Sequence, residues 1–515
     1  MNNPATNNNK NGYIGSSQET TYVALIQALE DKWERLCIHY LSVTPENSVW
    51  RFSRAITPDD PEQGWKIHIS ATILSANKIF EKVAPFLCSL GVLFKAPRSL
   101  LELKRMNCGL FYGFSQVGKF ITVYPKTPQD AVSIAHKLHQ LTDGFSCVAV
   151  PYDLPFRQNS CIYYRYGSFS TLAIENSDGT SIPAIRDPEG KLVPDLREPG
   201  TAVPSWATDP FVEKCHRSDN VSTTESPLKT TILAYEALSQ RGKGGVYRAL
   251  DLSVLPARLC VLKEGRRDGE TDWDGRDGYW RVQHEAQVLS SLFLAGVEVP
   301  RVYTTFQDGM HYYLVTEYLE GENLQSFLSK TKKIPIADAL RYGIQLARLL
   351  DKIHSAGWVW RDCKPLNLIL SKEGALRPLD FEGACPVDLP DRTPWGTNGY
   401  LPPEGLEEPV TGSRIPEDNY ALGSTLHQLL SGRTPYGTYP LPAIGKLRRH
   451  IPPVVRQIIS ALLDPDSNSR PNARTVLQSL EQACSEIGIW YSHDGVQSGV
   501  AAVSNLPHAA PNPHR

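Results

Sequence analysis

The residues best suited to chemistry form an ordered series in the C-terminal half of the chain. Lys263 lies in an apolar segment, CVLKE, and Glu285 follows in RVQHEAQVL, which has the character of a helix. Asp362 and Asn367 stand in WRDCKPLNLIL, and Asp380 stands in LDFEG. A lysine held by a glutamate neutralises phosphate charge, and carboxylate and amide oxygens suit Mg²⁺. The series predicts an ATP site with Asn367 and Asp380 as Mg²⁺ ligands and Asp362 orienting an attacking hydroxyl.

This series resembles the signature set of the protein kinases. The resemblance implies a bilobal kinase-like domain that uses ATP and Mg²⁺. Lys364 resembles the lysine of the Ser/Thr-directed members and is expected to steady the transferred group. Glu317, in LVTEYLEGENL, ends a predicted strand before a short connector and is expected to contribute to nucleotide binding.

The glycine-rich loop, LSQRGKGGVYRA, departs from the kinase pattern. Its expected nucleotide-binding residues are Gly242, Gly244, Gly245 and Val246. In an alignment on Val246, only Gly244 is in register, because Ser239 and Arg241 occupy the places of the first two glycines of the family. We therefore expect a tight loop whose grip on phosphate differs from that of the family.

Two further departures lie beside the catalytic residues. Trp360 replaces the usual His before Arg361-Asp362, and Glu382 replaces the Gly of the metal-binding loop. Beyond them, Asp418 and Arg470 match residues that, in the family, brace the catalytic loop and pair with the glutamate of the activation segment. That glutamate is Glu404 in GYLPPEG.

The N-terminal half presents a second set of candidate residues, each in or beside a predicted strand. They are His68 in WKIHISAT, Lys95 in VLFKAP, Lys119 in GKFITVYP and Arg165 in IYYRYGSF. Periodicity predicts helices over 20–43, 75–90 and 128–142 and strands over 65–71, 92–96, 120–124 and 147–150. Alternation in the first strand directs Lys66 and His68 to the face opposite Ile67 and Ile69. Each of the four candidates alone is more often solvated or a stacking contact.

Four segments of this half resemble the N-terminal lyase domain of class III and class IV lanthipeptide synthetases, in which a kinase-like domain follows directly. They are GWKIHISAT, GKFITVYPKT, CIYYRYGSF and IRDPEGKLVPDLREPG. The resemblance implies β-elimination of phosphate from phosphorylated Ser or Thr, giving dehydroalanine or dehydrobutyrine. Lys95 would be the base, and His68 would protonate the leaving oxygen. Lys119 and Arg165 would bind the phosphate, Arg165 through two parallel hydrogen bonds.

The expected partners are a precursor peptide and a separate cyclase. Full synthetases of this group continue into a zinc-dependent cyclase domain, whereas this chain stops at residue 515 without the Cys/His zinc set. Ring closure is therefore not expected of these two domains. Dehydration as the end point and a different role for the protein remain open.

The mixed series of predicted helices and strands indicates the α+β class. The predicted divisions are a disordered N-terminus (1–18), a phospho-Ser/Thr lyase-like domain (19–211), a linker (212–230), a protein-kinase-like domain (231–490) and a flexible tail (491–515). A formal charge of −2 shows no basic excess, so nucleic acid is not an expected partner. No apolar run reaches the roughly 20 residues of a membrane span. Ten scattered cysteines without zinc spacing favour reduced thiols and a cytoplasmic location.

Two other functions remain open. The chain could be a Ser/Thr protein kinase whose N-terminal domain only binds partners, with Thr393 and Thr397 as regulatory phosphorylation sites. It could also be a kinase-like scaffold without catalysis, because fold does not fix activity. Trp360 and Glu382 favour the scaffold, whereas the retained residues around Asp362 argue against it.

Overall fold

The protein is described here by a computed structural model. The described residues are 22–169, 172–176, 178–212, 231–331, 333–391, 393–406 and 412–486. The predicted disordered N-terminus, the predicted linker apart from Val212, and the predicted tail lie outside these ranges.

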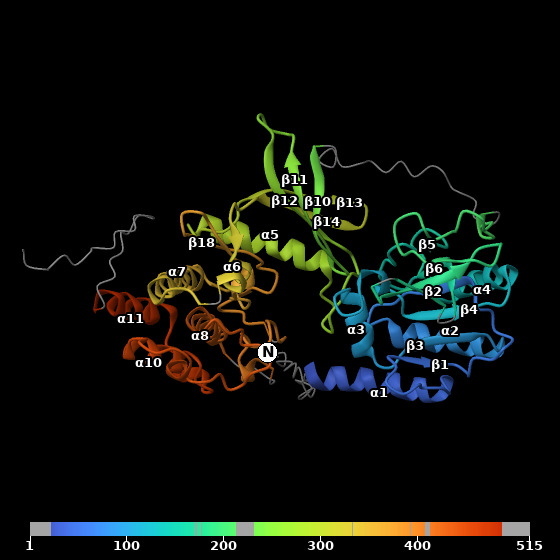
Figure 1. Cartoon of the computed structure of the whole chain (residues 1–515), viewed down its shortest axis with the longest axis horizontal. Coiled ribbons are helices and arrows are strands. Elements are labelled where there is room, and N and C mark those ends of the chain that lie inside the picture. Colours follow the sequence, from blue (N-terminus) through green and yellow to red (C-terminus); the bar gives the residue numbers. More distant parts are fainter. Residues whose placement is uncertain are drawn as a thin grey trace, which may run out of the picture.

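The N-terminal domain is built on a six-stranded antiparallel sheet in the order β1-β3-β4-β2-β6-β5 (Figure 1). Its strands are β1 (Trp50–Phe52), β2 (Gln63–Ile69), β3 (Leu93–Pro97), β4 (Ile121–Tyr124), β5 (Leu154–Pro155) and β6 (Ile162–Ser168). Its helices are α1 (Tyr22–Tyr40), α2 (Ala76–Ser89), α3 (Leu100–Cys108) and α4 (Pro128–Leu141). A small sheet of β7 (Ala173–Glu175), β8 (Ser181–Arg186) and β9 (Leu192–Pro194) follows.

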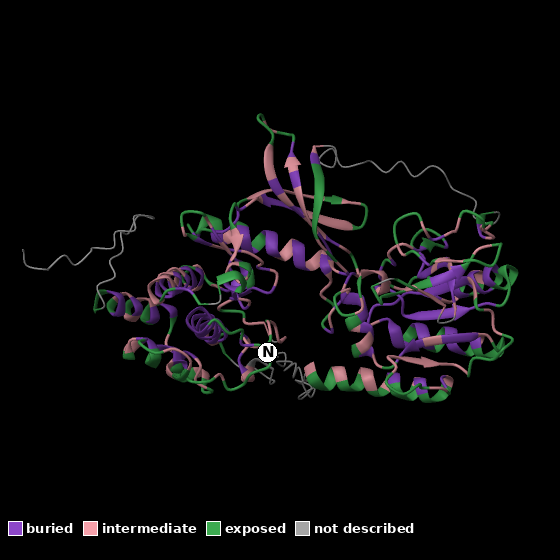
Figure 2. Cartoon of the chain, viewed as in Figure 1, coloured by how far each residue is buried: buried purple, intermediate pink, exposed green. Residues whose placement is uncertain are grey.

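The predicted alternation in β2 is confirmed and separates a core face from a polar face. Ile67 and Ile69 are fully buried in a cluster with Phe80 of α2 and Ala135 of α4. Figure 2 shows this sheet and its covering helix α2 as largely buried, while α1 exposes much of its surface. The core therefore holds β2 rigidly on one side, and the polar face carries the side chains that could do chemistry.

The predicted strand over 147–150 is wrong. The segment is extended, with Val148 and Val150 buried and Ala149 exposed, but it forms no ladder with a neighbouring strand. Instead, the Val148 carbonyl accepts a hydrogen bond of 2.5 Å from the Ser70 hydroxyl. Side-chain alternation predicts burial correctly here, but it does not reveal which group binds the backbone.

The C-terminal domain has two lobes. Its N-lobe is an antiparallel sheet in the order β10-β11-β12-β14-β13, with α5 (Gly278–Leu294) packed on β12 and β14. The strands are β10 (Ile232–Arg241), β11 (Gly244–Asp251), β12 (Arg258–Gly265), β13 (Val302–Asp308) and β14 (His311–Glu317). The C-lobe helices are α6 (Leu324–Thr331), α7 (Ile336–Ser355), α8 (Ile415–Ser431), α9 (Ile444–Leu447), α10 (Pro453–Leu462) and α11 (Ala473–Glu486). The C-lobe also contains short strands β15 (Glu322–Asn323), β16 (Trp358–Val359), β17 (Leu368–Leu370), β18 (Leu376–Pro378) and β19 (Cys385–Pro386).

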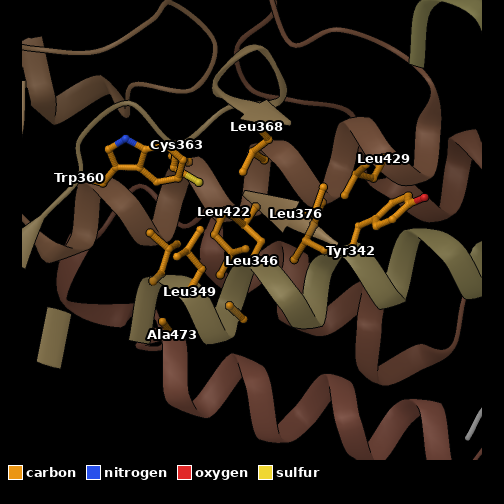
Figure 3. Packing of buried hydrophobic residues seen from close by; sticks show 14 of the residues in the cluster. Tyr342, Leu346, Leu349, Trp360, Cys363, Leu368, Leu376, Leu422, Leu429 and Ala473 are labelled. Carbon is orange, nitrogen blue, oxygen red and sulfur yellow. The ribbon is translucent and has the colours of Figure 1, made fainter. Parts of the chain in front are cut away.

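The C-lobe core anchors the segment that carries Asp362. Figure 3 shows Trp360, Cys363 and Leu368 of this segment in the same packed cluster as Leu346 of α7 and Leu422 of α8. All five side chains are fully buried. Apolar residues on both sides of Asp362 therefore fix the backbone from which its carboxylate projects.

The two domains touch through α3 and the N-lobe, which lie side by side in Figure 1. Trp273, in the loop between β12 and α5, belongs to the buried cluster of the N-terminal domain. Among the described residues, no helix combines the length and apolar character required to cross a membrane.

Candidate active sites

The first site lies between the two lobes of the C-terminal domain. β12 and α5 bring Lys263 and Glu285 together, with the Lys263 ammonium 2.6 and 2.8 Å from the two carboxylate oxygens. Glu285 also accepts the backbone N–H of Phe381 at 3.2 Å. Burial opposes a charge on Lys263, but Glu285 and Asp380 outweigh it and raise the pKa of the lysine. Lys263 is therefore a permanent cation.

The predicted catalytic residues Asp362, Lys364 and Asn367 form one hydrogen-bonded group. Lys364 lies 2.6 Å from the Asp362 carboxylate, and the Asn367 amide nitrogen donates to the same carboxylate at 2.8 Å. The Thr397 hydroxyl donates to the other Asp362 oxygen at 2.8 Å and accepts from Lys364 at 2.5 Å. Thr397 is thus part of this site rather than a freely exposed loop residue.

Trp360 makes the contacts that join the catalytic loop to the metal-binding loop. Its indole N–H donates to the Asp380 carbonyl at 2.9 Å, and its ring stacks on Phe381 at 5.3 Å between centroids. The predicted brace at Asp418 is confirmed, because its carboxylate accepts the backbone N–H groups of Trp360 and Arg361 at 2.8 and 2.6 Å.

The predicted pair of Arg470 with Glu404 is also confirmed, with a nitrogen–oxygen distance of 3.0 Å for one of its two bonds. Asp380 itself has a positive φ of 63°, a conformation that costs a non-glycine residue free energy and is typical of functional sites.

Sequence analysis missed the partner of Glu382. Gly242 and Lys243 form the tip of the β10–β11 hairpin, and the Lys243 ammonium lies 2.5 Å from the Glu382 carboxylate. The unusual glutamate of the metal-binding loop is thus neutralised by a lysine of the glycine-rich loop. Burial opposes the charge on Lys243, but Glu382 and Asp380 raise its pKa.

The other residues predicted to bind the nucleotide make contacts within the protein. A Cβ on Gly242 would lie 1.7 Å from the Asn107 carbonyl oxygen, and one on Gly244 would lie 1.7 Å from that of Glu264. Gly245 and Val246 continue into β11, where Val246 pairs with Lys263 across the sheet. The Glu317 carboxylate binds Arg377 at 3.1 Å, so its side chain braces the connector between the lobes.

The donor set suits a nucleotide with Mg²⁺. Because the amide nitrogen of Asn367 faces Asp362, its amide oxygen is left as the metal-binding atom. Burial would raise the pKa of Asp380, but Lys243, Lys263 and Lys364 lower it, so the carboxylate stays ionised. Within the described ranges, no three His, Cys, Asp or Glu side chains gather for a metal ion. Mg²⁺ would therefore be held by Asn367, Asp380 and the phosphates of the nucleotide.

The second site is a cavity of about 330 Å³ on the polar face of the N-terminal sheet. All four residues predicted for this half, His68, Lys95, Lys119 and Arg165, line it. Sheet register explains why they meet. Thr122 of β4 is flanked by Lys95 of β3 on one side and by His68 of β2 on the other. Arg165 of β6 lies opposite Lys66 of β2.

The cavity contains cations that sequence analysis did not select. Lys66 and Arg197 line it together with the predicted residues, and Lys66 is 9% exposed. Lys66 shares the polar face of β2 with His68, so the alternation was a signal that could have found it. Arg197 lies in IRDPEGKLVPDLREPG, one of the four segments that carry the resemblance to the lyase domain, so that resemblance was a signal that could have found it.

Burial, with a smaller contribution from neighbouring cations, sets the protonation of the lysines in the cavity. Burial, with Arg197 and Lys119 adding repulsion, lowers the pKa of Lys95 to about 8. Burial lowers the pKa of Lys119 to about 8 and that of Lys66 to about 7. The Lys95 ammonium also lies 4.2 Å from the centre of the Trp50 ring. These lysines can therefore lose a proton near neutral pH, unlike an ordinary lysine.

Sequence analysis also missed Asp153, which contacts two of the predicted residues, His68 and Lys119. Its carboxylate lies 2.5 Å from Nδ1 of His68 and 3.3 Å from the Lys119 ammonium. Burial would raise the pKa of Asp153, but His68 and Lys119 lower it to about 2. Burial lowers the pKa of His68, so the ring is neutral and Nδ1 donates to the carboxylate. This bond turns Nε2 away from Asp153.

The Arg165 guanidinium already donates hydrogen bonds to protein groups, so it is less available to a phosphate than predicted. Its Nη2 donates to Asp195 at 2.7 Å and to the Leu196 carbonyl at 2.8 Å, and its Nε donates to the Tyr166 carbonyl at 3.1 Å. Two parallel bonds from Arg165 to a phosphate would therefore require some of these contacts to open.

The fold and the two sites together define a kinase-type nucleotide domain joined to a domain with a cavity lined by several cations. Residues 242–480 match the family described as "Protein kinase domain", and residues 39–223 match "RamC, N-terminal domain". The chain therefore combines a RamC N-terminal domain with a protein kinase domain. A protein kinase domain implies the use of ATP.

Three relatives illustrate the similarity. The probable SapB synthase of Streptomyces coelicolor is 29% identical over 395 residues, which cover 74% of this chain and 41% of the relative. The 3-phosphoinositide-dependent protein kinase 1 of Arabidopsis thaliana is 32% identical over 37% of this chain and 43% of its own length. The serine/threonine-protein kinase F of a Synechocystis strain is 27% identical over 40% and 45%, respectively. The chain thus spans less than half the length of each of these relatives.

The role of Asp153 in holding buried cations gives a prediction about stability. Asp153→Asn should lower the free energy of unfolding of the N-terminal domain by about 3 kcal/mol at neutral pH, because the buried Lys119 loses its counter-ion. The loss should shrink as the pH rises above about 8, where Lys119 becomes neutral in the folded state.

Urea unfolding followed across this pH range measures the effect. Glu34→Gln is the matched control, since Glu34 pairs with Arg51 at the surface and should cost less than about 1 kcal/mol. An equal loss at every pH would contradict the assignment of Asp153 as the counter-ion of a titrating lysine.

The pairing of Lys243 with Glu382 predicts compensation between two substitutions. Lys243→Ala leaves a carboxylate uncompensated beside Asp380 and should weaken Mg·ATP binding about tenfold. Adding Glu382→Gly removes that carboxylate and should restore most of the affinity. Titration with a fluorescent ATP analogue measures each variant, and an additive loss in the double variant would contradict the pairing.

Proposed function

We propose that the chain dehydrates Ser and Thr residues of a precursor peptide in two steps, phosphorylation in the kinase domain and elimination in the N-terminal cavity. The observation that carries the proposal is the meeting of His68, Lys95, Lys119 and Arg165 in one cavity beside a kinase domain. The relative named a probable SapB synthase supports it, because its alignment of 395 residues is longer than either domain alone.

The phosphorylation step uses the group around Asp362. A Ser or Thr hydroxyl takes the place that Thr397 marks beside Asp362, which orients it and receives its proton. The hydroxyl oxygen bonds to the γ-phosphorus as the bond to ADP breaks. Lys263 neutralises the α- and β-phosphates, and Lys364 steadies the phosphoryl group that is transferred. Mg²⁺, bound by Asn367 and Asp380, supplies charge neutralisation at the phosphates.

The elimination step uses the cavity. A neutral Lys95 removes the α-proton of the phosphorylated residue, the Cα–Cβ double bond forms, and the bond from Cβ to the phosphate oxygen breaks. His68 gives a proton to the departing oxygen, and the cations retain the phosphate. Dehydroalanine forms from Ser and dehydrobutyrine forms from Thr.

Substrate binding explains how His68 can act as the acid although burial lowers its pKa in the free cavity. The free cavity has more cations than carboxylates, so a phosphate dianion supplies the missing negative charge. The same dianion stabilises the imidazolium and raises the pKa of His68. His68 therefore acquires its proton only when a phosphorylated residue is bound. Lys66 and Arg197 join Lys119 in holding that residue's phosphate.

In this proposal the two domains act on a peptide in the cytoplasm, and a cyclase that closes rings would be their partner. Activity of a Ser/Thr protein kinase alone is the competing function, and it differs in its product. A kinase alone leaves stable phosphopeptide, whereas the proposed enzyme releases phosphate and leaves an alkene.

The proposal predicts which intermediate accumulates in each variant. The test is mass spectrometry of a candidate Ser/Thr-containing precursor peptide, incubated with ATP and Mg²⁺. Wild type should remove the mass of one water per modified residue. Lys95→Ala should leave phosphopeptide, with elimination slowed by about 10² to 10⁴. Asp362→Asn should leave the peptide unmodified.

A synthetic phosphoserine peptide bypasses the first step and serves as the control. Asp362→Asn should convert it at the wild-type rate, whereas Lys95→Ala should not. A wild-type protein that adds phosphate and never removes it would eliminate the lyase half of the proposal.

The base assignment predicts a rising pH dependence. Because Lys95 must be neutral to accept a proton, kcat/KM for the phosphoserine peptide should increase as the pH rises towards about 8. Above that value it should fall, because Lys119 loses the charge that binds phosphate, whereas Lys66 loses its charge already near pH 7. The measurement is kcat/KM from about pH 6 to about pH 9, and a flat profile would argue against a lysine base.

A further inference from the structure

The contact between the domains is centred on the loop between β12 and α5, residues 266–277, which we call the docking loop. Trp273 in this loop is only 4% exposed and packs in the hydrophobic cluster of the N-terminal domain, although it belongs to the kinase domain. An ideal Cβ on Gly275 would lie 3.9 Å from the Leu74 side chain at the same contact. One domain thus contributes a core residue to the other.

Polar contacts on helix α3 surround this anchor. The Asp272 carboxylate accepts from Lys104 at 2.5 Å and from the Tyr22 hydroxyl at 3.2 Å. One residue pair joins the hairpin tip directly to the helix, since the Gly242 N–H donates to the Cys108 carbonyl at 3.1 Å. No side chain fits at position 242, so this close approach requires glycine.

The docking loop also holds two parts of the nucleotide site. Asp277 caps α5 by accepting the Trp280 N–H at 2.8 Å and also accepts the Asp268 N–H at 2.7 Å. Helix α5 carries Glu285, the partner of Lys263. The Arg266 N–H donates to the Lys243 carbonyl at 2.8 Å and so ties the loop to the hairpin tip.

From these contacts we infer that the N-terminal domain is a built-in positioning partner of the kinase site, acting through Lys104, Asp272 and Trp273. It fixes the start of α5, and with it Glu285, and it fixes the hairpin tip that carries Lys243. The inference rests on the proposed function for its activity readout, but it assigns a new role to residues that touch neither substrate nor nucleotide. They are positioning residues for phosphate transfer.

The inference requires that weakening the contact impairs one active site and spares the other. When α3 releases the docking loop, α5 and the hairpin tip gain freedom, and fewer molecules have Lys263 and Glu285 paired. Lys104 and Trp273 are not part of the cavity lining, to which α3 contributes Met106, and the cations of the lining come from other elements. Nucleotide affinity and phosphate transfer should fall together, while elimination from a phosphorylated peptide should persist.

The test uses Lys104→Glu in the full chain, which places a carboxylate against Asp272. We expect binding of a fluorescent ATP analogue and phosphorylation of the peptide each to fall about tenfold, in the usual range of coupling between sites. Elimination from the synthetic phosphoserine peptide should stay within about twofold of wild type. Hydrogen exchange in α5 (Gly278–Leu294) should accelerate.

Arg105→Glu is the matched control, because Arg105 is the next residue of α3 and pairs with Glu102 within the same helix. It should change none of these measurements. Trp273→Ala should have the same effect as Lys104→Glu, but a larger one. If Trp273→Ala fails to fold, the measurements on Lys104→Glu decide the test. The inference would be overturned if Lys104→Glu bound the nucleotide with wild-type affinity and showed wild-type hydrogen exchange in α5. Neither measurement needs turnover, so failure of the proposed function would be recognised separately.

Discussion

The balance between cations and carboxylates is the constraint on which both sites depend, because each must hold several positive charges where phosphate will bind. In the kinase site every lysine has its own carboxylate: Lys243 with Glu382, Lys263 with Glu285 and Lys364 with Asp362. Beside the N-terminal cavity, Asp153 and Asp195 pair with residues that line it, and the cations of the lining outnumber these two carboxylates. The pKa of a lysine side chain is therefore shifted in opposite directions in the two sites. Lys243 and Lys263 have raised pKa values, while Lys66, Lys95 and Lys119 have lowered ones.

This contrast fits the chemistry proposed for each site. Phosphate transfer needs cations that never lose their charge, and a paired lysine meets that need. Elimination needs a base strong enough to remove an α-proton yet unprotonated near neutral pH, and a lysine crowded by other cations meets that need. The number of carboxylates available to each lysine therefore decides its role. A lysine with its own carboxylate stays charged and binds phosphate, whereas a lysine without one can act as a general base.

Sequence analysis predicted most elements and most of both sites, for identifiable reasons. Periodicity gave β2 and α2, because one face of each is buried in a continuous core. The kinase motifs gave Asp362 and Asp380 because their spacing is local. Resemblance to a family, rather than periodicity, gave Lys95.

What sequence analysis missed depends on contacts between distant segments. Asp153 meets His68 across 85 residues of chain, and Trp273 fills a core that belongs to another domain. Lys243 meets Glu382 across 139 residues. The error over 147–150 has the same origin, since the Ser70 hydroxyl that binds the Val148 carbonyl is distant in sequence. The pattern of side chains in a segment indicates which residues are buried, but it does not indicate which distant residues they contact.

The departures from the kinase pattern argue for a working nucleotide site rather than a decayed one. A site released from selection would be expected to leave replaced residues without compensating contacts. Here Trp360 supplies an N–H to Asp380 and a ring to Phe381. Glu382 is neutralised by Lys243 from a different strand pair, so the departures in the glycine-rich loop and in the metal-binding loop compensate each other. Gly242 appears out of register with the family's glycines because it serves the contact with α3. The loop that departs most from the pattern is therefore the loop that joins the two domains.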